Sequence, residues 1–521
     1  MSRASACKAC LCCLSAAAVL TVIGGCAVGP DFKRPEAPKA AGYTPAPLPA
    51  TTASVPGIAG AAQDFSSERD IPAEWWTLFR SPALDSLIKR AFAANPTIAS
   101  AQAALAEAQE NVYAQQGLFY PTVQASYSPS RTKIAGNLGG NSPGVQGNGS
   151  VISTVQNTPA AQGGTAPFNA PVIYNFHTVQ LTVGFVPDIF GANRRQVESL
   201  QAQADAQHFQ LEATYITLAS NVVAAAIQEA SVKAQIAALK QIIDSNTRSL
   251  DILHRQLQSG YAGQLDVAAQ ESALAQSQEQ LPALEKQLAQ TRDLIRVLAG
   301  NTPDQDVSES FELQSFQLPQ ELPLSLPSRL VEQRPDVRAA EEQLHAACAA
   351  VGVAEADRLP QFSINATAGG EASQFGQMFW DSGKFFSVIG SISQTLFDGG
   401  TLKHRQRAAE QALLQADAEY RSTALTAFQN VADTLHALYA DADTLKAATV
   451  AEQAARRTLD ITRRQQQAGY AGYLTLLTAE QNFQQAEMAL VQAEASRLGD
   501  TAALVQALGG GWWNRDYQPK D

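Results

Sequence analysis

Cysteine is almost absent from the body of this chain. Five of the six cysteines lie within the first 26 residues, and only Cys348 lies beyond them. An internal disulfide bond needs two cysteines and a cysteine-based metal cage needs several. Both are therefore excluded for the body of the protein.

Charge is sparse as well, and positive charge is the scarcer kind. The 521 residues include 37 Lys or Arg and 49 Asp or Glu, giving a formal net charge of −12. Proteins that bind nucleic acids usually carry a basic patch, so this class is disfavoured. Beyond the N-terminus there is no run of 18 apolar residues, so no membrane-spanning helix is expected there.

Recognisable catalytic motifs are missing too. The six histidines show neither His-x-x-x-His nor His-Glu-x-x-His spacing, and neither a Gly-x-Ser-x-Gly string nor a phosphate-binding glycine loop occurs. The sequence therefore predicts no enzyme, no catalytic residue, no metal site and no cofactor. These histidines are His177, His208, His254, His345, His404 and His436.

The first 26 residues have the order of a secretory signal peptide. Positive Arg3 and Lys8 precede a short apolar stretch at residues 11–23, and two glycines then precede Cys26. This ending resembles a bacterial lipobox, which implies that Cys26 is acylated and becomes the mature N-terminus. Ala27 implies sorting to the outer membrane. The alternative is an ordinary signal peptide with a chance cysteine. We assign 1–25 to the signal peptide and 26–74 to an acylated, extended arm on the surface.

The rest of the chain contains an internal sequence repeat. Gly191 and Gly260 bracket 68 residues without Gly or Pro, and Gly400 and Gly469 bracket another 68, each boundary displaced by 209 positions. At 1.5 Å per residue, each stretch predicts a helix about 100 Å long. We expect a first repeat at 75–300, a linker at 301–328, a second repeat at 329–508 and a tail at 509–521.

Each long helix ends in the same Gly-Tyr-Ala-Gly turn and is expected to return as a shorter helix, at 264–300 and 473–508. Apolar residues spaced by three and four predict coiled-coil seams, and Pro282 is expected to kink the first returning helix. An ordinary antiparallel coiled coil, as in a filament or scaffold, would show the same helices. The predicted seams comprise Ile236, Leu239, Ile243, Asn246, Leu250, Leu253 and Leu257, then Leu281, Leu284, Leu288, Thr291, Ile295 and Leu298, then Leu474, Leu477, Gln481, Gln484, Met488, Val491, Ala495 and Leu498.

Each repeat also contains a pair of alternating strands, predicted at 120–129 with 177–188 and at 361–371 with 384–397. One face is apolar and the other carries Ser, Thr, Asn and Gln, which suits a bilayer outside and a wet lumen inside. A soluble sheet with one solvated face is the alternative. Four strands leave two open edges, which lipid does not tolerate. A spanning barrel would therefore need several chains, and three copies give twelve strands.

With these features, the chain resembles the TolC/OprM-type outer-membrane efflux channels, and most of all their NodT-type lipoprotein branch. The resemblance implies an α+β membrane protein: a trimeric 12-stranded β-barrel, four strands per chain, continued by a long periplasmic α-helical barrel. Residues 27–74, 301–328 and 509–521 would form an equatorial collar. The matching strings are Gly-Cys-Ala-Val-Gly-Pro-Asp-Phe at 25–32, Trp-Trp-Thr-Leu-Phe at 75–79, Arg-Pro-Asp-Val-Arg-Ala-Ala-Glu at 334–341, Leu-Phe-Asp-Gly-Gly at 396–400 and Tyr-Leu-Thr-Leu-Leu at 473–477.

The resemblance also implies the function. Such channels are the exit ducts of tripartite efflux pumps and passively conduct drugs or other small molecules out of the cell. Their partners are two sibling chains, outer-membrane lipid, a periplasmic adaptor and an inner-membrane transporter that is usually proton-driven. The alternative is a lipid-anchored periplasmic coiled-coil scaffold or adhesin without a pore.

Site residues follow from the same resemblance. Many relatives carry Leu, then Asp four residues on and Arg seven residues on, around a periplasmic constriction. Here these positions hold Leu474, Thr478 and Gln481, so we expect a neutral gate ring. Leu474 could instead be an ordinary seam residue, and Asp460, Arg463 and Arg464 could supply other ion pairs near the tip. The expected adaptor-contact tips are Gly260, Tyr261, Gly263, Gly469, Tyr470 and Gly472. The polar insert at 134–170 is expected to be an extracellular loop.

Overall fold

The computed structural model describes residues 27–36, 42–46, 49–66, 69–134, 143–145, 151–153 and 172–515. Cys26, the signal peptide and most of the 134–170 insert lie outside the described residues. The chain divides into two compact units, which are described separately. The strand unit contains residues up to 32, 109–202 and 345–414, and the hairpin unit contains 33–108, 203–344 and 415 onward.

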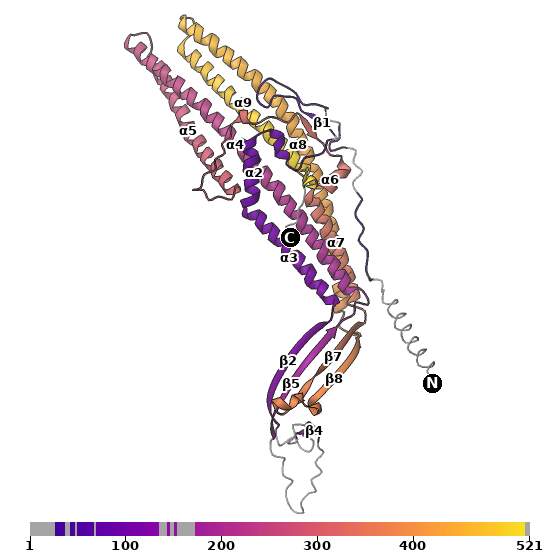
Figure 1. Cartoon of the computed structure of the whole chain (residues 1–521). Helices are drawn as coiled ribbons and strands as arrows, with labels where there is room; N and C mark the ends of the chain where they lie inside the picture. Colours follow the sequence, from indigo (N-terminus) through magenta and orange to yellow (C-terminus); the bar gives the residue numbers. More distant parts are fainter. Residues whose placement is uncertain are drawn as a thin grey trace, which may run out of the picture. The chain divides into compact units, whose positions relative to one another are not determined.

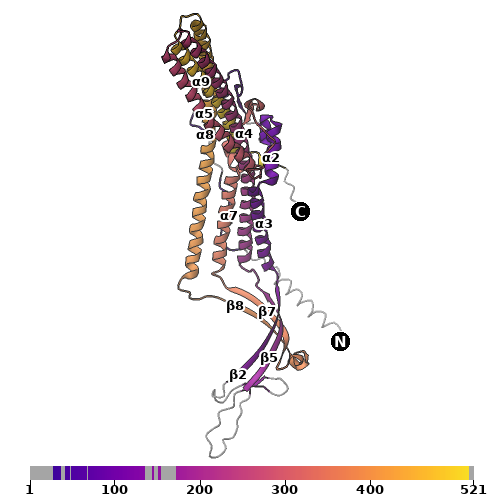
Figure 2. The same cartoon turned by 90° about the vertical axis from the view of Figure 1, so that its left-hand side faces the viewer.

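A four-stranded antiparallel sheet forms the centre of the strand unit. The strand order is β2-β5-β7-β8, so β2 and β8 are the two edges (Figure 1). Figure 2 shows that the sheet is strongly curved. The strands are β2 (Thr122–Ile134), β5 (Val172–Phe185), β7 (Gln361–Ala372) and β8 (Lys384–Ser393).

Strand lengths differ from those predicted. The β2–β5 ladder continues to the pair Ile134 and Val172, well beyond the predicted ends at 129 and 177, and β8 ends at Ser393 rather than 397. Backbone pairing carries the first ladder past the residues in which apolar and polar side chains alternate. Within the insert, β3 (Pro143–Val145) pairs antiparallel with β4 (Val151–Ser153).

Two very long helices confirm the reading of the two Gly-bounded stretches. α4 (Ala192–Gln258) and α8 (Thr401–Gln467) have 67 residues each, and they return as α5 (Gln264–Leu298) and α9 (Tyr473–Ala507) with 35 residues each. Both antiparallel hairpins are visible in Figure 1. α5 continues through Pro282 without interruption, so this proline does not end the helix.

Both long helices begin at the same kind of cap. The Asp188 carboxylate accepts hydrogen bonds of 3.0 Å from the N–H groups of Asn193 and Arg194. The Asp398 carboxylate likewise accepts bonds of 2.8 Å from the N–H groups of Gly400 and Leu402. A carboxylate satisfies N–H groups that have no partner within the helix and complements the helix dipole. The duplicated glycines are thus preceded by duplicated aspartate caps.

Four shorter helices start at prolines, where the missing N–H costs nothing and φ is already helical. Two of them, α3 and α7, are the Ala-rich helices expected before the strand pairs. The four helices are α2 (Pro82–Ala94), α3 (Pro96–Gln116), α6 (Pro327–Gln333) and α7 (Pro335–Ala356). Just before α2, the side chains of Trp75, Trp76 and Phe79 are buried in the core of the hairpin unit.

The segments expected to form a collar do meet within the hairpin unit. β1 (Asp64–Ser66) pairs in parallel with β6 (Glu321–Pro323), and the Trp513 indole N–H donates to Asp70 over 3.0 Å. The N-terminal arm does not merely lie on the surface, as the sequence suggested, because Thr52 and Gln63 are buried. Its composition hid these buried polar contacts.

One described helix, α4, contains an 18-residue window apolar enough to cross a membrane by length and composition. Inside the protein, 72% of that window is buried. A core helix of a folded domain has the same composition, and α4 is such a helix.

Candidate functional site

One face of the four-stranded sheet is apolar across all four strands. The register aligns Val123 with Val183, Val183 with Ala366, and Ala366 with Val388. Several of these side chains are exposed, with Phe386 83% accessible. Exposed apolar rows are unfavourable in water and favourable in lipid. The apolar face consists of Val123, Ala125, Tyr127, Val179, Leu181, Val183, Ile364, Ala366, Ala368, Phe386, Val388 and Ile392.

The opposite face carries neutral polar groups. Gln124 lies opposite Thr182, and Thr182 opposite Thr367, which in turn pairs with Ser387. Ile389, beside Asn365, is an apolar exception. Hydroxyl and amide side chains hydrogen-bond to water and do not select solutes by the sign of their charge. This face suits the wall of a water-filled passage.

Both hairpins end in the same turn. Gly260 and Gly469 have φ of +77° and +79°, and the next residue, Tyr261 or Tyr470, donates its N–H to a carbonyl five positions back over 2.8 Å. This is the Schellman motif, in which glycine takes the left-handed conformation at low cost. The tyrosine side chains are 86% and 87% exposed. The predicted contact residues therefore lie free at the tips of the single chain.

The three predicted gate residues share one exposed face of α9. Leu474 is 48% exposed, and Thr478 and Gln481 are also exposed. Thr478 Oγ1 donates to the Leu474 carbonyl over 2.9 Å, so this hydroxyl is satisfied within its own helix. Leu474 is not enclosed in the seam of the chain and is free to face other surfaces.

The seam predicted for α9 is partly wrong near the tip. There Leu476 and Ala479 are buried against Leu459 of α8, whereas Leu474 and Gln481 are exposed. The spacing of three and four fitted both sets of residues, and contacts between helices selected one of them.

A buried hydrogen-bond chain joins the two hairpins, and the sequence did not reveal it. The Tyr473 hydroxyl donates to Oε1 of Gln270 over 2.5 Å. Gln270 Nε2 donates to the Asn246 carbonyl over 2.9 Å, and Asn246 Nδ2 donates to Oγ of Ser277 over 3.1 Å. Burial raises the pKa of Tyr473, which keeps the phenol protonated as a donor. The sequence feature that could have indicated this buried contact is Asn246, a polar residue in an apolar seam.

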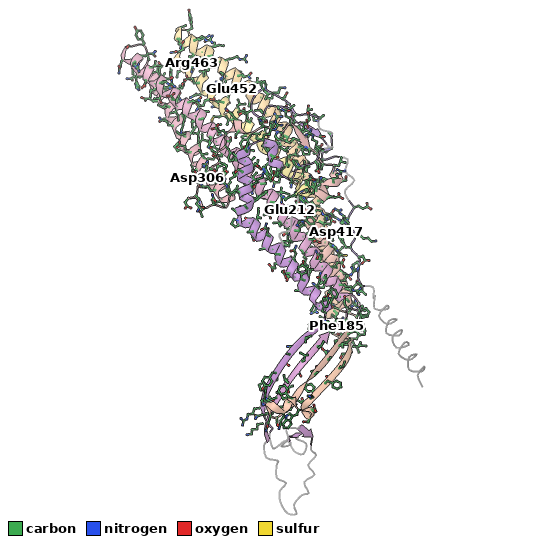
Figure 3. All side chains as sticks on the ribbon, in the orientation of Figure 1. Phe185, Glu212, Asp306, Asp417, Glu452 and Arg463 are labelled. Atoms are coloured by element: carbon green, nitrogen blue, oxygen red, sulfur yellow. The ribbon has the colours of Figure 1, made fainter. Side chains whose placement is uncertain are left out.

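An ion pair connects α8 and α9 near the same tip. Arg463 Nη2 lies 3.4 Å from Oε1 of Glu480, and burial raises the pKa of that carboxyl despite the arginine. Arg456 lies on the same helix, α8, and its Cζ is 5.3 Å from the centre of the Phe483 ring. Figure 3 labels Arg463 and Glu452 in this hairpin. Of the charged residues considered from the sequence, Arg463 thus has a partner across the hairpin.

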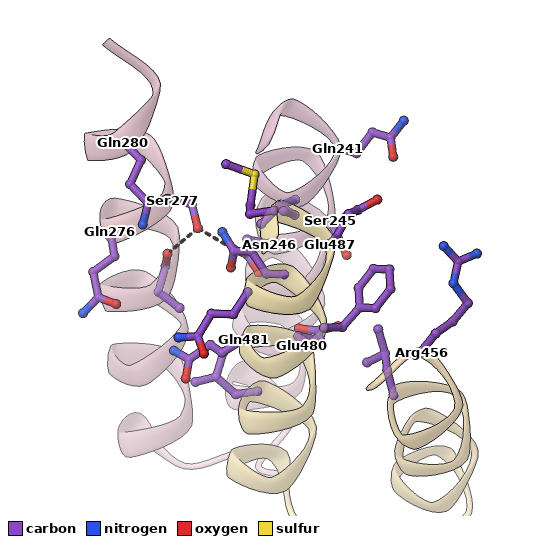
Figure 4. A pocket seen from close by; sticks show the side chains of 18 of the residues that line it. Gln241, Ser245, Asn246, Gln276, Ser277, Gln280, Arg456, Glu480, Gln481 and Glu487 are labelled. Carbon is purple, nitrogen blue, oxygen red and sulfur yellow. Dashed lines mark hydrogen bonds between the residues drawn. The ribbon is translucent and has the colours of Figure 1, made fainter. Parts of the chain in front are cut away.

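A cavity of about 790 Å³ separates the two hairpins behind these contacts (Figure 4). All four helices line it, α8 with Arg456 and Leu459. Amide side chains are frequent on the other three: Gln241 and Asn246 from α4, Gln276 from α5, and Gln481 and Gln484 from α9. A close-packed interface would resist displacement of one hairpin past the other. This partly open interface leaves the Tyr473 chain as a specific connection between them.

A model of the family described as "Outer membrane efflux protein" matches residues 87–301 and 326–510. The chain belongs to the outer membrane efflux protein family. In the described part of the chain, no group of three or more His, Cys, Asp or Glu could hold a metal ion.

Curated relatives span almost the whole chain. It is 27% identical over 512 residues to the probable efflux pump outer membrane protein TtgC of Pseudomonas putida, covering 97% of this chain and 96% of the relative. It is also 27% identical over 470 residues to the pyoverdine export outer membrane protein OpmQ of the same species, covering 89% and 94%.

Solved structures agree on the fold. The outer-membrane channel OprN matches with a TM-score of 0.78 at 25% identity, covering 94% of this chain and 100% of that one. The CmeC outer membrane channel of Campylobacter jejuni matches with a TM-score of 0.79 at 20% identity, covering 93% and 95%. These matches confirm the predicted fold class.

The family membership settles the broad function. This outer membrane efflux protein is an outer-membrane component of an efflux pump and not an enzyme. The alternative of a periplasmic scaffold or adhesin without a pore is wrong, because the relatives along the whole chain are efflux channels.

Proposed function

We propose that three copies of this chain close into a twelve-stranded barrel that passively conducts small molecules out of the cell. The two-faced sheet with open edges at β2 and β8 carries the proposal. Unpaired edge groups are costly in a bilayer, so β8 of one copy would pair with β2 of the next.

The direct test is the subunit count of the detergent-solubilised particle by native mass spectrometry, combined with conductance in planar bilayers. We expect a trimer that conducts ions. A stable single subunit without conductance would contradict the proposal.

We further propose that the hairpin tips bind a periplasmic adaptor, which connects the duct to a proton-driven inner-membrane transporter. The exposed Tyr261 and Tyr470 support this, since exposed aromatic residues are frequent contact anchors. A photo-cross-linking residue at either position should capture an adaptor in intact cells, whereas one at exposed Glu279, on the side of α5, should not. Equal capture at all three positions would contradict the assignment.

The cargo we propose is drugs and other small organic molecules. Relatives are named for the efflux of toluene and antibiotics and for pyoverdine export. The neutral polar face of the sheet supports the passage of varied solutes, because it favours neither positively nor negatively charged ones. Deleting the gene should raise intracellular accumulation of a fluorescent dye, and the complete chain should restore efflux. Unchanged accumulation in the deletion strain would argue against this cargo.

Finally, we propose that Cys26 is acylated. The segment that follows it is held in place within the strand unit: Arg195 Nη2 pairs with Asp31 over 2.6 Å, and the Phe32 ring stacks on His345 at 4.4 Å. An anchor at Cys26 would thus connect to a fixed segment. Mass spectrometry should find lipid on the mature N-terminus of the wild type and none in Cys26→Ser. An unmodified wild-type N-terminus would exclude the anchor.

A further inference from the structure

The connection between β7 and β8 folds back over the apolar face of the sheet. It contains two short 3-10 helices, η4 (Phe375–Phe379) and η5 (Asp381–Gly383). A Cβ on Gly370 of β7 would lie 2.1 Å from the carbonyl oxygen of Met378, so the two backbones are in direct contact. The Met378 side chain is 1% exposed. The connection is therefore a packed layer on the sheet.

Aromatic contacts show which face this layer covers. The Phe375 ring packs edge-to-face on Tyr127 at 5.7 Å and on His177 at 6.3 Å. Tyr127 aligns with Val179, and His177 lies two residues before Val179 on β5, so both belong to the apolar face. A shallow cavity between the layer and the sheet is also lined by apolar-face residues, including Leu181 and Ala368. The layer covers the side of the sheet that faces lipid.

The outer surface of the layer is aromatic. Phe375, Phe379 and Trp380 are 55%, 60% and 58% exposed. Beside them, Lys384 Nζ pairs with Asp381 over 2.7 Å. Aromatic rings next to charged groups are typical of the boundary between lipid acyl chains and headgroups. In water, the same rings would form an unfavourable exposed patch.

The height of the layer agrees with that boundary. Eight residues along β7 separate Phe362, near the strand's start, from Gly370, which aligns with Lys384. Eight residues span about 26 Å along a strand, or about 20 Å across the bilayer at a tilt of about 40°. The apolar band of outer-membrane barrels is about 25 Å tall. The layer therefore lies near the outer end of the band.

We propose that residues 375–383 form an external anchor that inserts into the outer leaflet at the acyl–headgroup boundary. The occupant of its aromatic surface is bilayer lipid, because this surface continues the lipid-facing rows of the sheet. The anchor would fix the height of the barrel at its extracellular end. The proposal rests on the barrel proposed above.

Trp380 allows a direct test on the full-length protein in phosphatidylcholine vesicles. The fluorescence of Trp380 is obtained by subtracting the emission of Trp380→Phe from that of the wild type. Nitroxide at carbon 5 of the acyl chain should quench this difference at least twofold, and nitroxide at carbon 12 or aqueous iodide should quench it less. Stronger quenching by iodide or by carbon-12 nitroxide, or quenching by no probe, would overturn the anchor.

Two controls keep the outcome interpretable. Phe379→Trp in the otherwise wild-type chain adds a second tryptophan to the layer, and the added fluorescence should give the same depth profile. This variant covers the case in which Trp380→Phe folds poorly. Ion flux through the same vesicles reports the barrel independently. Vesicles that conduct without shallow quenching would refute the anchor alone, whereas vesicles that do neither would refute the barrel as well.

Discussion

Arg497 of α9, buried at 0% exposure, donates a 2.8 Å hydrogen bond from Nη2 to Oγ1 of Thr52 in the N-terminal arm. The same nitrogen also donates to the carbonyls of Ala53 and Ala61. The Arg497 guanidinium thus connects the N-terminal arm to α9, the returning helix of the second hairpin. Burial lowers the pKa of Arg497, with nearby Asp441 opposing that effect.

Replacing this arginine should loosen the arm. Arg497→Met keeps an unbranched, shorter side chain and removes the guanidinium donor from three acceptors, of which Thr52 Oγ1 still accepts from the Gln63 N–H. We expect a loss of about 1–2 kcal/mol in the free energy of unfolding. Thermal unfolding of the solubilised protein measures this. Arg421→Met removes an exposed arginine that pairs with Asp417 one turn away, and should change stability by less than about 0.5 kcal/mol. Equal effects would rule out the fastening role.

If the Tyr473 chain holds the channel closed, Tyr473→Phe should favour the open channel. The variant removes the hydroxyl that binds Gln270 and leaves a buried amide oxygen without its donor. A loss of about 1.4 kcal/mol in the closed state raises the open-to-closed ratio about tenfold. Single-channel recording in planar bilayers reports that ratio. Tyr470→Phe, at an exposed tip residue, is the matched control and should behave as wild type.

Leu474→Ala should raise conductance if Leu474 lines the constriction. The side chain is half exposed in the single chain, so its removal should cost little stability while widening a ring of three. Leu476→Ala is the contrasting variant, because Leu476 is buried against Leu459 and its loss should destabilise the fold by about 2–5 kcal/mol. Unchanged conductance of Leu474→Ala would remove it from the gate.

Glu494 should make stability depend on pH. Burial raises the pKa of this α9 carboxyl from its ordinary 4.5 to about 7. The unfolded carboxyl therefore ionises first, and the free energy of unfolding falls as pH rises from about 4.5 to 7. We expect a fall of about 2 kcal/mol, since partial solvent contact reduces the full effect.

Melting curves at pH 4.5 and pH 8 test this dependence. Glu494→Gln should reduce the fall between those values, because the amide does not titrate. Part of the fall should remain, since burial also raises the pKa of Asp441 to about 7. Glu279→Gln, at an exposed position on α5, should leave the pH dependence of the wild type intact. A Glu494→Gln variant that keeps the full dependence would assign it to other groups.

Much of the fold was readable because it depends on local chemistry. Gly260 and Gly469 mark both tips, since only glycine takes a left-handed cap cheaply. Alternation along Val123, Ala125 and Tyr127 predicted a two-faced strand, which the register bears out. Strand ends were less predictable, because the β2–β5 ladder runs on through backbone hydrogen bonds that any side chain allows.

The contacts between the two hairpins could not be predicted from the sequence. Tyr473 and Gln270 are 203 positions apart, and nothing in their spacing marks them as partners. Likewise, the spacing of three and four along α9 admitted Leu474 and Leu476 equally, and packing against Leu459 placed only Leu476 in the seam.

By itself, the sequence determined the duplicated architecture: glycine, proline and periodicity act over a few residues, so they fix helices, turns and strand faces locally. Tertiary structure alone decided which polar groups are buried together, as with Arg497 and Thr52, and which aromatic residues are left on the lipid-facing side of the sheet, as with Trp380. These outcomes depend on segments far apart in the chain, whose proximity arises only from packing.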